Sequence, residues 1–427
     1  AMDLINKLIW AIAVSFLTLS SVYYSFRLRF VQVNFLKIFS CFKRSGSKDG
    51  ISAGDSLIMS LSSKIGVGSL AGISFAIYYG GLGSIFWIWV ITFFTSINCY
   101  VENILAILYK KADKYECQGG PFYYIKNGLG KKWLAVFYAI LVIVSYSTGF
   151  IAIQNNTMTT LFGEMYNVNV IFVSFLITIL SSFIFLRGIK TVSNFCNKIF
   201  PIMMVIYLFV GLLVFLDNVS FVPTLFINIV KSAFSGDAMS GGIIYILLIG
   251  FQKGIFQTEA GVGTSAMISG ISNNNDYIKQ GNMGIVSTYF IGFVISSVTA
   301  LIVSTSDFGL LKGSSINGIE LTKYAFNYHF GYFGEVVLLS ILVLFAFSTI
   351  VTVYYYALNN LKGLTNKKLL ITILKVVTIL SLFIGGIVSS SFVWKMIDIF
   401  VGLLTIINTY SIFMLRDVVV DKVRSSN

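Results

Sequence analysis

Two long hydrophobic segments of this chain are each interrupted near their middle by closely spaced glycines. The first interruption lies at 65–69 and includes Gly66 and Gly68, and the second lies at 257–264 and includes Gly261 and Gly263. Lipid cannot hydrogen-bond free N–H and C=O groups, so unwound backbone at this depth must be buried in protein or face a water-filled cavity. Because the breaks occupy corresponding points of the two halves, they indicate a binding site near the middle of a bilayer.

Composition places the chain among membrane proteins. Of its 427 residues, 56% are hydrophobic and only 11% are charged, and the mean hydropathy is +0.86. A soluble protein of this size could not cover so much apolar surface, so we predict an all-α polytopic membrane protein. The net charge of +13 does not form a basic stripe with interleaved aromatic residues, and nucleic acid is therefore not an expected partner.

Apolar stretches of about 20 residues, the length that crosses a bilayer, predict about eleven transmembrane helices. Residues 4–26 run directly into Arg27 and Arg29 without a small-residue cleavage site, so we expect a retained helix and not a signal peptide. The predicted spans are 4–26, 52–79, 83–109, 133–162, 169–186, 196–216, 238–269, 281–305, 332–358, 369–388 and 391–415.

Basic residues concentrate in alternate connections between these spans. Positively charged loops remain in the cytoplasm, which predicts an external N-terminus and a cytoplasmic tail at 416–427. The basic connections contain Arg27, Arg29, Lys37, Lys43, Arg44, Lys48, Lys110, Lys111, Lys114, Lys126, Lys131, Lys132, Arg187, Lys190, Lys198, Lys362, Lys367 and Lys368, whereas the alternate ones hold only Lys231, Lys312, Lys323 and Lys395.

The spans divide into an extra helix and two halves. Residues 1–50 hold the extra helix and a basic loop, 51–217 form the first half, 237–415 the second, and each half opens with its broken helix. Because each half has five spans, the halves insert with opposite topology, an inverted repeat that alternates access to a central site. An open channel is the alternative, although no segment resembles the re-entrant filter loop of channels.

Several glycine-rich and aromatic motifs follow one another along the chain: Gly66-Val67-Gly68-Ser69, Gly80-Gly81-Leu82-Gly83, Gly119-Gly120-Pro121, Phe256 before Glu259-Ala260-Gly261, and Phe345-Ala346-Phe347-Ser348-Thr349. In this order they resemble the motifs of one family, the alanine or glycine:cation symporters of bacteria and archaea. The resemblance implies a leucine-transporter-like fold in the cytoplasmic membrane and sodium-coupled uptake of small neutral amino acids.

The resemblance and the chemistry of the breaks together give a candidate substrate site. Half-helix N-termini present free N–H groups and a positive dipole end to a carboxylate. By resemblance, the amide of Gln154 contacts the substrate and Phe256 covers it, while the small Val353 predicts a substrate bulkier than alanine or glycine. The candidate residues are Gly66, Gly68, Ser69, Gln154, Phe256, Thr258, Gly261, Gly263 and Val353.

A sodium site is expected, by resemblance, at the Ser348-Thr349 pair. Their hydroxyls would face the backbone carbonyls of Ser62, Ile65 and Phe345 and supply oxygen ligands without a buried net charge. The alternative is that each hydroxyl bonds only to the backbone of its own helix.

Lys64 adds an ionisable group beside the first break, where a charge is costly and indicates a functional site. It could replace a coupling sodium, carry a proton because desolvation lowers its pKa, or compensate a carboxylate such as Glu259. The first two interpretations predict a sodium-independent or proton-coupled transporter or exchanger.

Enzyme motifs are not found in the sequence. It has no Walker-type loop, no zinc-binding His pair and no Gly-x-Ser-x-Gly elbow, so we expect no enzymatic activity and no cofactor beyond sodium as the coupling ion. The remaining alternative to a transporter is a receptor that binds an amino acid without moving it. The connections 218–236 and 306–330 are expected to be external and to contain short amphipathic helices.

Overall fold

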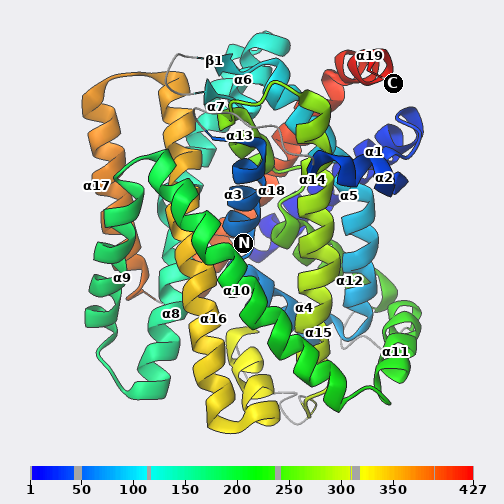
Figure 1. Cartoon of the computed structure of the whole chain (residues 1–427), viewed down its shortest axis with the longest axis vertical. Coiled ribbons are helices and arrows are strands. Elements are labelled where there is room, and N and C mark those ends of the chain that lie inside the picture. Colours follow the sequence, from blue (N-terminus) through cyan, green and yellow to red (C-terminus); the bar gives the residue numbers. More distant parts are fainter. Residues whose placement is uncertain are drawn as a thin grey trace.

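The computed structural model describes residues 2–42, 51–112, 117–235, 242–307, 309, 318–388 and 390–426. Within these ranges the chain is helical except for one small antiparallel hairpin, which pairs β1 (Lys111–Ala112) with β2 (Cys117–Gln118). The predicted all-α membrane class is therefore confirmed (Figure 1).

The helices follow one another with short connections. Up to residue 235 the chain contains α1 (Met2–Arg27), α2 (Phe35–Phe39), α3 (Ala53–Lys64), α4 (Ile73–Gly80), α5 (Gly83–Leu108), α6 (Pro121–Tyr123), α7 (Lys132–Val144), α8 (Ile151–Tyr166), α9 (Val170–Phe185), α10 (Ile189–Asp217) and α11 (Val222–Phe234). From residue 242 it contains α12 (Gly242–Thr258), α13 (Thr264–Ile271), α14 (Tyr277–Tyr289), α15 (Ser296–Ser304), α16 (Gly318–Leu364), α17 (Lys368–Gly385), α18 (Ser390–Met414) and α19 (Arg416–Ser425).

Wider or tighter turns join some of these helices. The π-helical turns η5 and η6 make α7–α8 and α14–α15 continuous, and η3 lies at the first break. The short elements are η1 (Val31–Val33), η2 (Ser40–Phe42), η3 (Gly68–Gly72), η4 (Tyr124–Gly128), η5 (Ser145–Phe150) and η6 (Phe290–Ile295).

Each predicted span contains a helix, but not all are long enough to count alone as spans. Among the described residues, eight helices are long and apolar enough to cross a membrane, or nine when α3 and the η3–α4 helix, bent by 57°, count as one. Helices α9 and α12 are shorter apolar helices. The number eleven and the leucine-transporter-like repeat therefore remain predictions.

Helix α16 consists of two helices that are separated by a kink at Gly331 (φ 60°, ψ −152°). The first starts at Gly318, and the second starts after Gly331, where the predicted span 332–358 also begins. Glycine tolerates this positive φ. The expected short helix in the connection 306–330 is therefore the first part of α16, and the one in 218–236 is α11.

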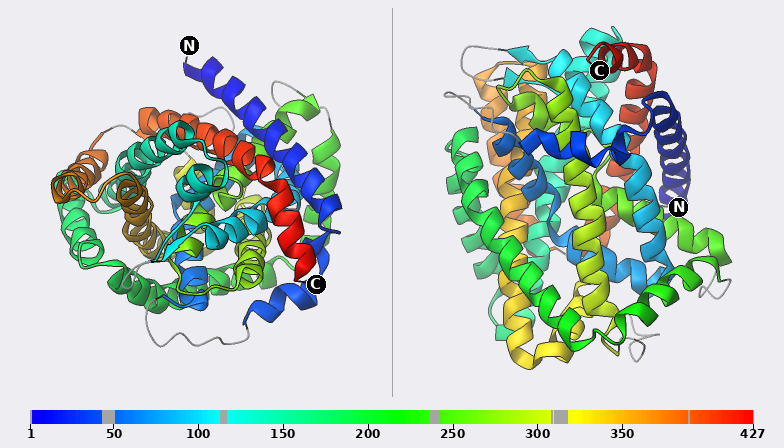
Figure 2. Two further views of the ribbon diagram at one scale, coloured as in Figure 1. Left: turned by 90° about the horizontal axis from the view of Figure 1, so that it is seen from above. Right: turned by 45° about the vertical axis from the view of Figure 1, so that its right-hand side comes forward.

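The two broken helices lie together inside the molecule. Helix α3 packs against α13, and α4 packs against α12. Helix α5 packs against both α12 and α14, while α1 lies beside α18 and α5 at one edge (Figure 2). The packing therefore brings two regions about 190 residues apart in sequence, 65–69 and 257–264, into one interior.

The basic connections gather at one end of the molecule. In Figure 1, β1, α6, the start of α17 and α19 lie at the top, whereas α11 and the junction of α15 with α16 lie at the bottom. We call the top the basic end and the bottom the opposite end. Lys43, Arg44, Lys48, Lys114 and Lys312 lie outside the described residues.

Candidate functional site

The first break is the unwound stretch between α3 and η3. Helix α3 starts with a capping box formed by Ser52 and Asp55, and it stops at Lys64. The amide N–H of Val67 donates to Oε1 of Gln154 at 3.0 Å, which satisfies one of the N–H groups that the break exposes. A Cβ at Gly66 would lie 2.8 Å from both Gln154 Oε1 and Thr349 Oγ1, so a larger residue would displace these side chains.

The five residues of the candidate sodium site meet beside this break. The Ser348 hydroxyl donates to the carbonyl oxygens of Phe345 (2.9 Å) and Ser62 (3.2 Å). The Thr349 hydroxyl lies 2.9 Å from the carbonyl of Phe345, 3.2 Å from that of Ser62 and 3.4 Å from that of Ile65. The hydroxyls therefore bond both to their own helix and across to α3. Such a cluster of neutral oxygens can replace the hydration shell of a monovalent cation.

Phe256 connects the second broken helix to the first break. A Cβ at Gly68 would lie 3.2 Å from the Phe256 ring. This ring is stacked with Phe150 at 5.9 Å and tilted against Trp394 at 5.8 Å between centroids. An aromatic group held in this way can cover a small molecule at the first break and exclude water from it.

Ser69 and Val353 are buried near the same break. The carbonyl of Ser69 accepts from the Thr299 hydroxyl at 2.9 Å, and its own Oγ has no hydrogen-bond partner among the described residues. Val353 is fully buried and lies four residues, about one helical turn, after Thr349.

The second break lies between α12 and α13 and contains three residues with positive φ. Glu259 has φ 51°, Gly261 83° and Gly263 100°. The Asn408 amide donates to the Gly261 carbonyl at 2.9 Å, and the Tyr138 hydroxyl donates to the Val262 carbonyl at 2.7 Å. Side chains from α18 and α7 thus satisfy the carbonyls that the break frees.

Three candidate substrate-binding residues make contacts away from the first break. A Cβ at Gly261 would lie 2.3 Å from Leu17 of α1, and one at Gly263 would lie 2.4 Å from Pro121. The Thr258 hydroxyl donates to the Gly254 carbonyl of its own helix at 2.8 Å. The structure therefore brings Gly66, Gly68, Gln154 and Phe256 together, whereas the two glycines of the second break pack against α1 and α6.

Lys64 is buried among groups from three elements. Its side chain is 5% exposed, and Nζ lies 4.0 Å from Cys99 Sγ. Its charge acts on Glu102 and Glu259, which are both buried. Neither carboxylate forms a salt bridge with it; among the described residues the one salt bridge joins Lys323 to Glu164 at 3.1 Å.

Sequence reasoning missed several residues that hold the breaks. Asn408 donates to Glu102 Oε2 at 2.8 Å as well as to the second break, and its Oδ1 is bonded to the hydroxyl of Tyr124. An amide or carboxylate within an apolar span is itself a signal of function, which could have singled out Asn408. Nothing in the local sequence distinguishes Tyr138 or Tyr124 from packing residues.

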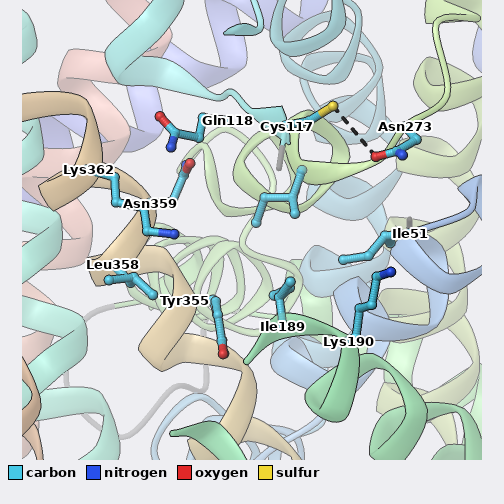
Figure 3. A pocket seen from close by; sticks show the side chains of 11 residues that line it. Ile51, Cys117, Gln118, Ile189, Lys190, Asn273, Tyr355, Leu358, Asn359 and Lys362 are labelled. Atoms are coloured by element: carbon cyan, nitrogen blue, oxygen red, sulfur yellow. Dashed lines mark hydrogen bonds between the residues drawn. The ribbon is translucent and has the colours of Figure 1, made fainter. Parts of the chain in front are cut away.

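A pocket opens at the basic end of the molecule. Figure 3 shows Tyr355, Asn359 and Lys362 of α16 around it, with Ile189 and Lys190 of α10 nearby. The remaining lining residues are Ile51, Cys117, Gln118, Ile271, Asn273 and Leu358.

This pocket and the hydroxyls of Ser348 and Thr349 lie along the same helix, α16. Ser348, Thr352, Tyr355 and Asn359 recur at spacings of four, three and four residues, so they lie on one face of that helix. Between the pocket and Ser348, the Thr352 hydroxyl lies 3.4 Å from Cys196 Sγ of α10. This contact covers the face of α16 between the pocket and Ser348.

Comparison with known proteins assigns the family. The sequence model of the sodium:alanine symporter family matches residues 1–426. The chain is 33% identical over 417 residues to the amino-acid carrier protein AlsT of Bacillus subtilis, covering 97% of this chain and 89% of that protein. It is 31% identical to the protein named probable sodium/glutamine symporter GlnT of the same bacterium (97% and 87% covered). It is 28% identical to the sodium/alanine symporter AgcS of Methanococcus maripaludis (99% and 96% covered).

The resemblance expected from the motifs is thus confirmed over the whole chain. The matched residues include both breaks, the Ser348-Thr349 pair and the residues packed around them. The chain therefore belongs to the sodium:alanine symporter family.

Proposed function

We propose that this chain is a secondary active transporter that carries small neutral amino acids across the cytoplasmic membrane by alternating access, in symport with sodium. One observation carries the proposal: the hydroxyls of Ser348 and Thr349 meet the carbonyls of Ser62 and Ile65 at the first break, beside Gln154. The names of the relatives, an amino-acid carrier and sodium symporters for glutamine and alanine, support it.

The geometry suggests how ion and substrate are coupled. A sodium ion held by Ser348, Thr349 and the carbonyls of Ser62, Ile65 and Phe345 would join α16 to the end of α3. The amino acid would lie beside Gly66 and Gly68, next to the Gln154 amide and under Phe256. Because the Gly66 backbone lies against both Gln154 and Thr349, ion binding and substrate binding share one segment. Binding of one therefore orders the site of the other.

The size of the side chain at position 353 affects which substrates can fit beside the first break. Val353 lies one turn from Thr349 and has a small side chain. We propose that it leaves room for a substrate bulkier than alanine or glycine. A competition experiment in which alanine outcompetes glutamine and leucine would contradict this part of the proposal.

A second candidate function is sodium-independent or proton-coupled transport, in which Lys64 takes the place of the ion. The position of its Nζ, 4.0 Å from Cys99 on α5, instead favours the interpretation that Lys64 compensates the carboxylates of Glu102 and Glu259. For this reason sodium symport is the leading proposal.

The orientation of the chain in the membrane can be inferred from the distribution of its basic residues. We propose that the basic end faces the cytoplasm, which places the N-terminus outside and α19 with the C-terminal tail inside a bacterial cytoplasmic membrane. The clustering of the basic connections at one end of the molecule supports this orientation, since positive loops are retained in the cytoplasm.

The function is tested by uptake into proteoliposomes containing the purified chain. Radiolabelled alanine, glycine and glutamine are each offered with an inward sodium gradient, with a proton gradient, and with neither. Accumulation that requires sodium is the expected result. Accumulation driven by protons or by exchange alone would favour the Lys64 alternative, and saturable binding without accumulation would identify a receptor.

A further inference from the structure

A groove on the outside of the molecule is formed by α1, α7 and α18. Helices α1 and α7 each pack against α18, and the groove between them has a volume of about 370 Å³. Sites for small molecules typically measure about 300–1,000 Å³. The lining is almost entirely apolar, and its aliphatic and phenyl side chains are Ile12 and Phe16 of α1, Leu134 of α7, and Ile406 and Ile407 of α18.

The groove opens onto a surface of exposed apolar side chains. Ile12 is 55% exposed, and Trp133 at the start of α7 is 70% exposed. Ile5, Leu8 and Leu19 are also exposed, and their spacing places them on the same face of α1 as Ile12. A continuous apolar surface of this kind marks contact with a membrane or another apolar partner. In a membrane-spanning chain the groove is therefore open to the acyl chains of the bilayer.

Lys131 adds a positive charge at the side of the groove nearest the basic end, where α7 starts. Its ammonium group donates to the hydroxyl of Tyr410 and lies 4.8 Å from the centre of that ring. An ammonium group has three donors, and no carboxylate of the described residues lies within salt-bridge distance of it. Lys132 follows it and is exposed. The apolar groove thus ends at two cations.

This combination matches the chemistry of an anionic phospholipid. The apolar walls suit an acyl chain, and the two ammonium groups suit a phosphate. Trp133 stands beside them, and tryptophan is enriched at the level of lipid headgroups. Basic pockets between membrane helices on the cytoplasmic side bind anionic headgroups. A neutral lipid would fill the same walls but leave the charges of Lys131 and Lys132 without a partner.

Two of the helices that line the groove also hold the second break. Leu17, which follows Phe16 on α1, would lie 2.3 Å from a Cβ at Gly261. Asn408, which follows Ile407 on α18, donates to the Gly261 carbonyl at 2.9 Å. A molecule that fills the groove therefore packs against the two helices whose inner faces contact this break.

We propose that the groove binds an anionic phospholipid of the surrounding bilayer. Part of an acyl chain lies along Ile12, Phe16 and Ile406, and the phosphate binds the ammonium groups of Lys131 and Lys132. The bound lipid holds α1 against α18 and so supports the second break. This site goes beyond the proposed function and does not depend on which solute is transported.

The first test measures lipid specificity by stability. The purified chain in detergent is titrated with phosphatidylglycerol or with phosphatidylcholine of the same acyl chains, and the thermal unfolding midpoint is followed. We expect phosphatidylglycerol to raise the midpoint saturably, because a ligand of the folded state stabilises it. Phosphatidylcholine should need at least about tenfold higher concentrations. For the double variant Lys131→Gln, Lys132→Gln we expect the same increase for phosphatidylglycerol, which corresponds to about 1.4 kcal/mol.

The matched control is the double variant Lys367→Gln, Lys368→Gln. These adjacent lysines are also exposed where a helix, α17, starts at the basic end, but they do not line the groove. Their loss should leave the response to phosphatidylglycerol unchanged. Equal losses in the two double variants would indicate only a general attraction of basic surfaces and would overturn the inference. A wild-type response of the Lys131→Gln, Lys132→Gln variant would overturn it as well.

A second variant tests the apolar part and keeps the inference testable if the lysine variant does not fold. Ile12→Trp places a larger ring in the groove from an exposed position. Leu19→Trp lies on the same face of α1 but outside the groove and is the control. Native mass spectrometry detects phosphatidylglycerol that each protein retains. We expect the wild type and Leu19→Trp to retain the lipid and Ile12→Trp to lose it. Equal retention by all three would contradict the site.

Uptake separates this inference from the proposed function. The wild type should accumulate amino acid faster in proteoliposomes that contain phosphatidylglycerol than in pure phosphatidylcholine, and the Lys131→Gln, Lys132→Gln variant should lose this difference. Equal uptake by the wild type in both membranes would contradict the supporting role of the lipid. Absence of uptake in both, with the stabilisation by phosphatidylglycerol intact, would contradict the proposed transport function and not the lipid site.

Discussion

At the scale of single residues, the candidate site consists of neutral oxygens with separate buried charges around them. The hydroxyls of Ser348 and Thr349 bond to backbone carbonyls at the end of α3, and these oxygens could serve as ligands of a cation without adding a buried charge. Lys64 lies by Cys99 on α5, and its charge acts on Glu102 and Glu259. The neutral and charged groups therefore have separable roles, which substitutions can distinguish.

Removing one hydroxyl should weaken sodium activation. Thr349→Val keeps the shape of the side chain but removes an oxygen, and contacts with a charged group are worth about 1.5–3 kcal/mol. We expect the sodium concentration for half-maximal uptake to rise at least about tenfold, measured in proteoliposomes. Thr378→Val is the control, because that buried hydroxyl donates only to the Leu374 carbonyl of its own helix. Equal effects of the two substitutions would contradict the sodium site.

Removing the Lys64 ammonium should destabilise the protein. Lys64→Met removes a buried cation that acts on the carboxyl groups of Glu102 and Glu259 without forming a salt bridge to either, and loss of a compensating charge destabilises buried carboxylates. We expect a lower thermal unfolding midpoint in detergent, partly recovered in Lys64→Met combined with Glu259→Gln. Lys368→Met, at an exposed position, serves as control. If Lys64→Met instead stays stable and becomes more dependent on sodium, Lys64 is the tethered substitute for the ion.

At the scale of elements, the function depends on helices that stop inside the molecule and on what satisfies their ends. At the first break a side-chain amide binds the Val67 N–H, and at the second break Asn408 and Tyr138 bind two carbonyls. Each break is thus held by a side chain from another helix. The second break also contains a backbone turn, in which the Val262 N–H donates to the Glu259 carbonyl at 3.2 Å.

A methyl group added at the first break should therefore impair transport without preventing folding. In Gly66→Ala the new Cβ would lie 2.8 Å from Gln154 Oε1 and from Thr349 Oγ1, so both must shift. We expect uptake to fall by at least about tenfold while the protein still folds, since a local shift of this kind costs about 1–3 kcal/mol. Gly54→Ala in the adjoining helix α3 meets only Ser52 Oγ, at 3.8 Å, and should transport normally. Full activity in Gly66→Ala would rule out this arrangement as the transport site.

At the scale of the whole molecule, charge and packing define two ends and an interior. The basic connections lie at one end, the pocket of Figure 3 opens there, and both broken helices lie inside. The pocket and the hydroxyl pair share one face of α16, interrupted by the contact between Thr352 and Cys196. Movement of α10 against α16 would open that face toward the basic end.

The orientation can be tested with the native cysteines. Cys117 lines the pocket and is partly exposed, whereas Cys41, Cys99 and Cys196 are buried. Burial also raises the pKa of the Cys41 thiol to about 11, so little reactive thiolate is present near pH 7. A membrane-impermeant maleimide should label inside-out vesicles and leave right-side-out vesicles unlabelled. Cys117→Ser should abolish the label. Labelling of right-side-out vesicles alone would reverse the orientation.

The sequence alone determined the class, the helical segments and the two breaks of this protein. These features are local: length and apolarity produce a membrane helix, and closely spaced glycines interrupt it. The Ser348-Thr349 pair and its partners Ser62, Ile65 and Phe345 could be predicted because a family motif marks them, and the structure brings these five together. The span predicted from 332 starts directly after the kink at Gly331, because the long apolar segment begins there.

Only the tertiary structure decided which distant side chains complete the interior. Asn408 reaches the second break from 147 positions away in sequence, and Leu17 of the extra helix α1 packs against Gly261. Lys253 of α12 lies over the ring of Phe75 of α4 only because α4 packs against α12. Contacts of this kind leave no periodicity or spacing in the chain, because they depend on how helices pack and not on how each helix forms.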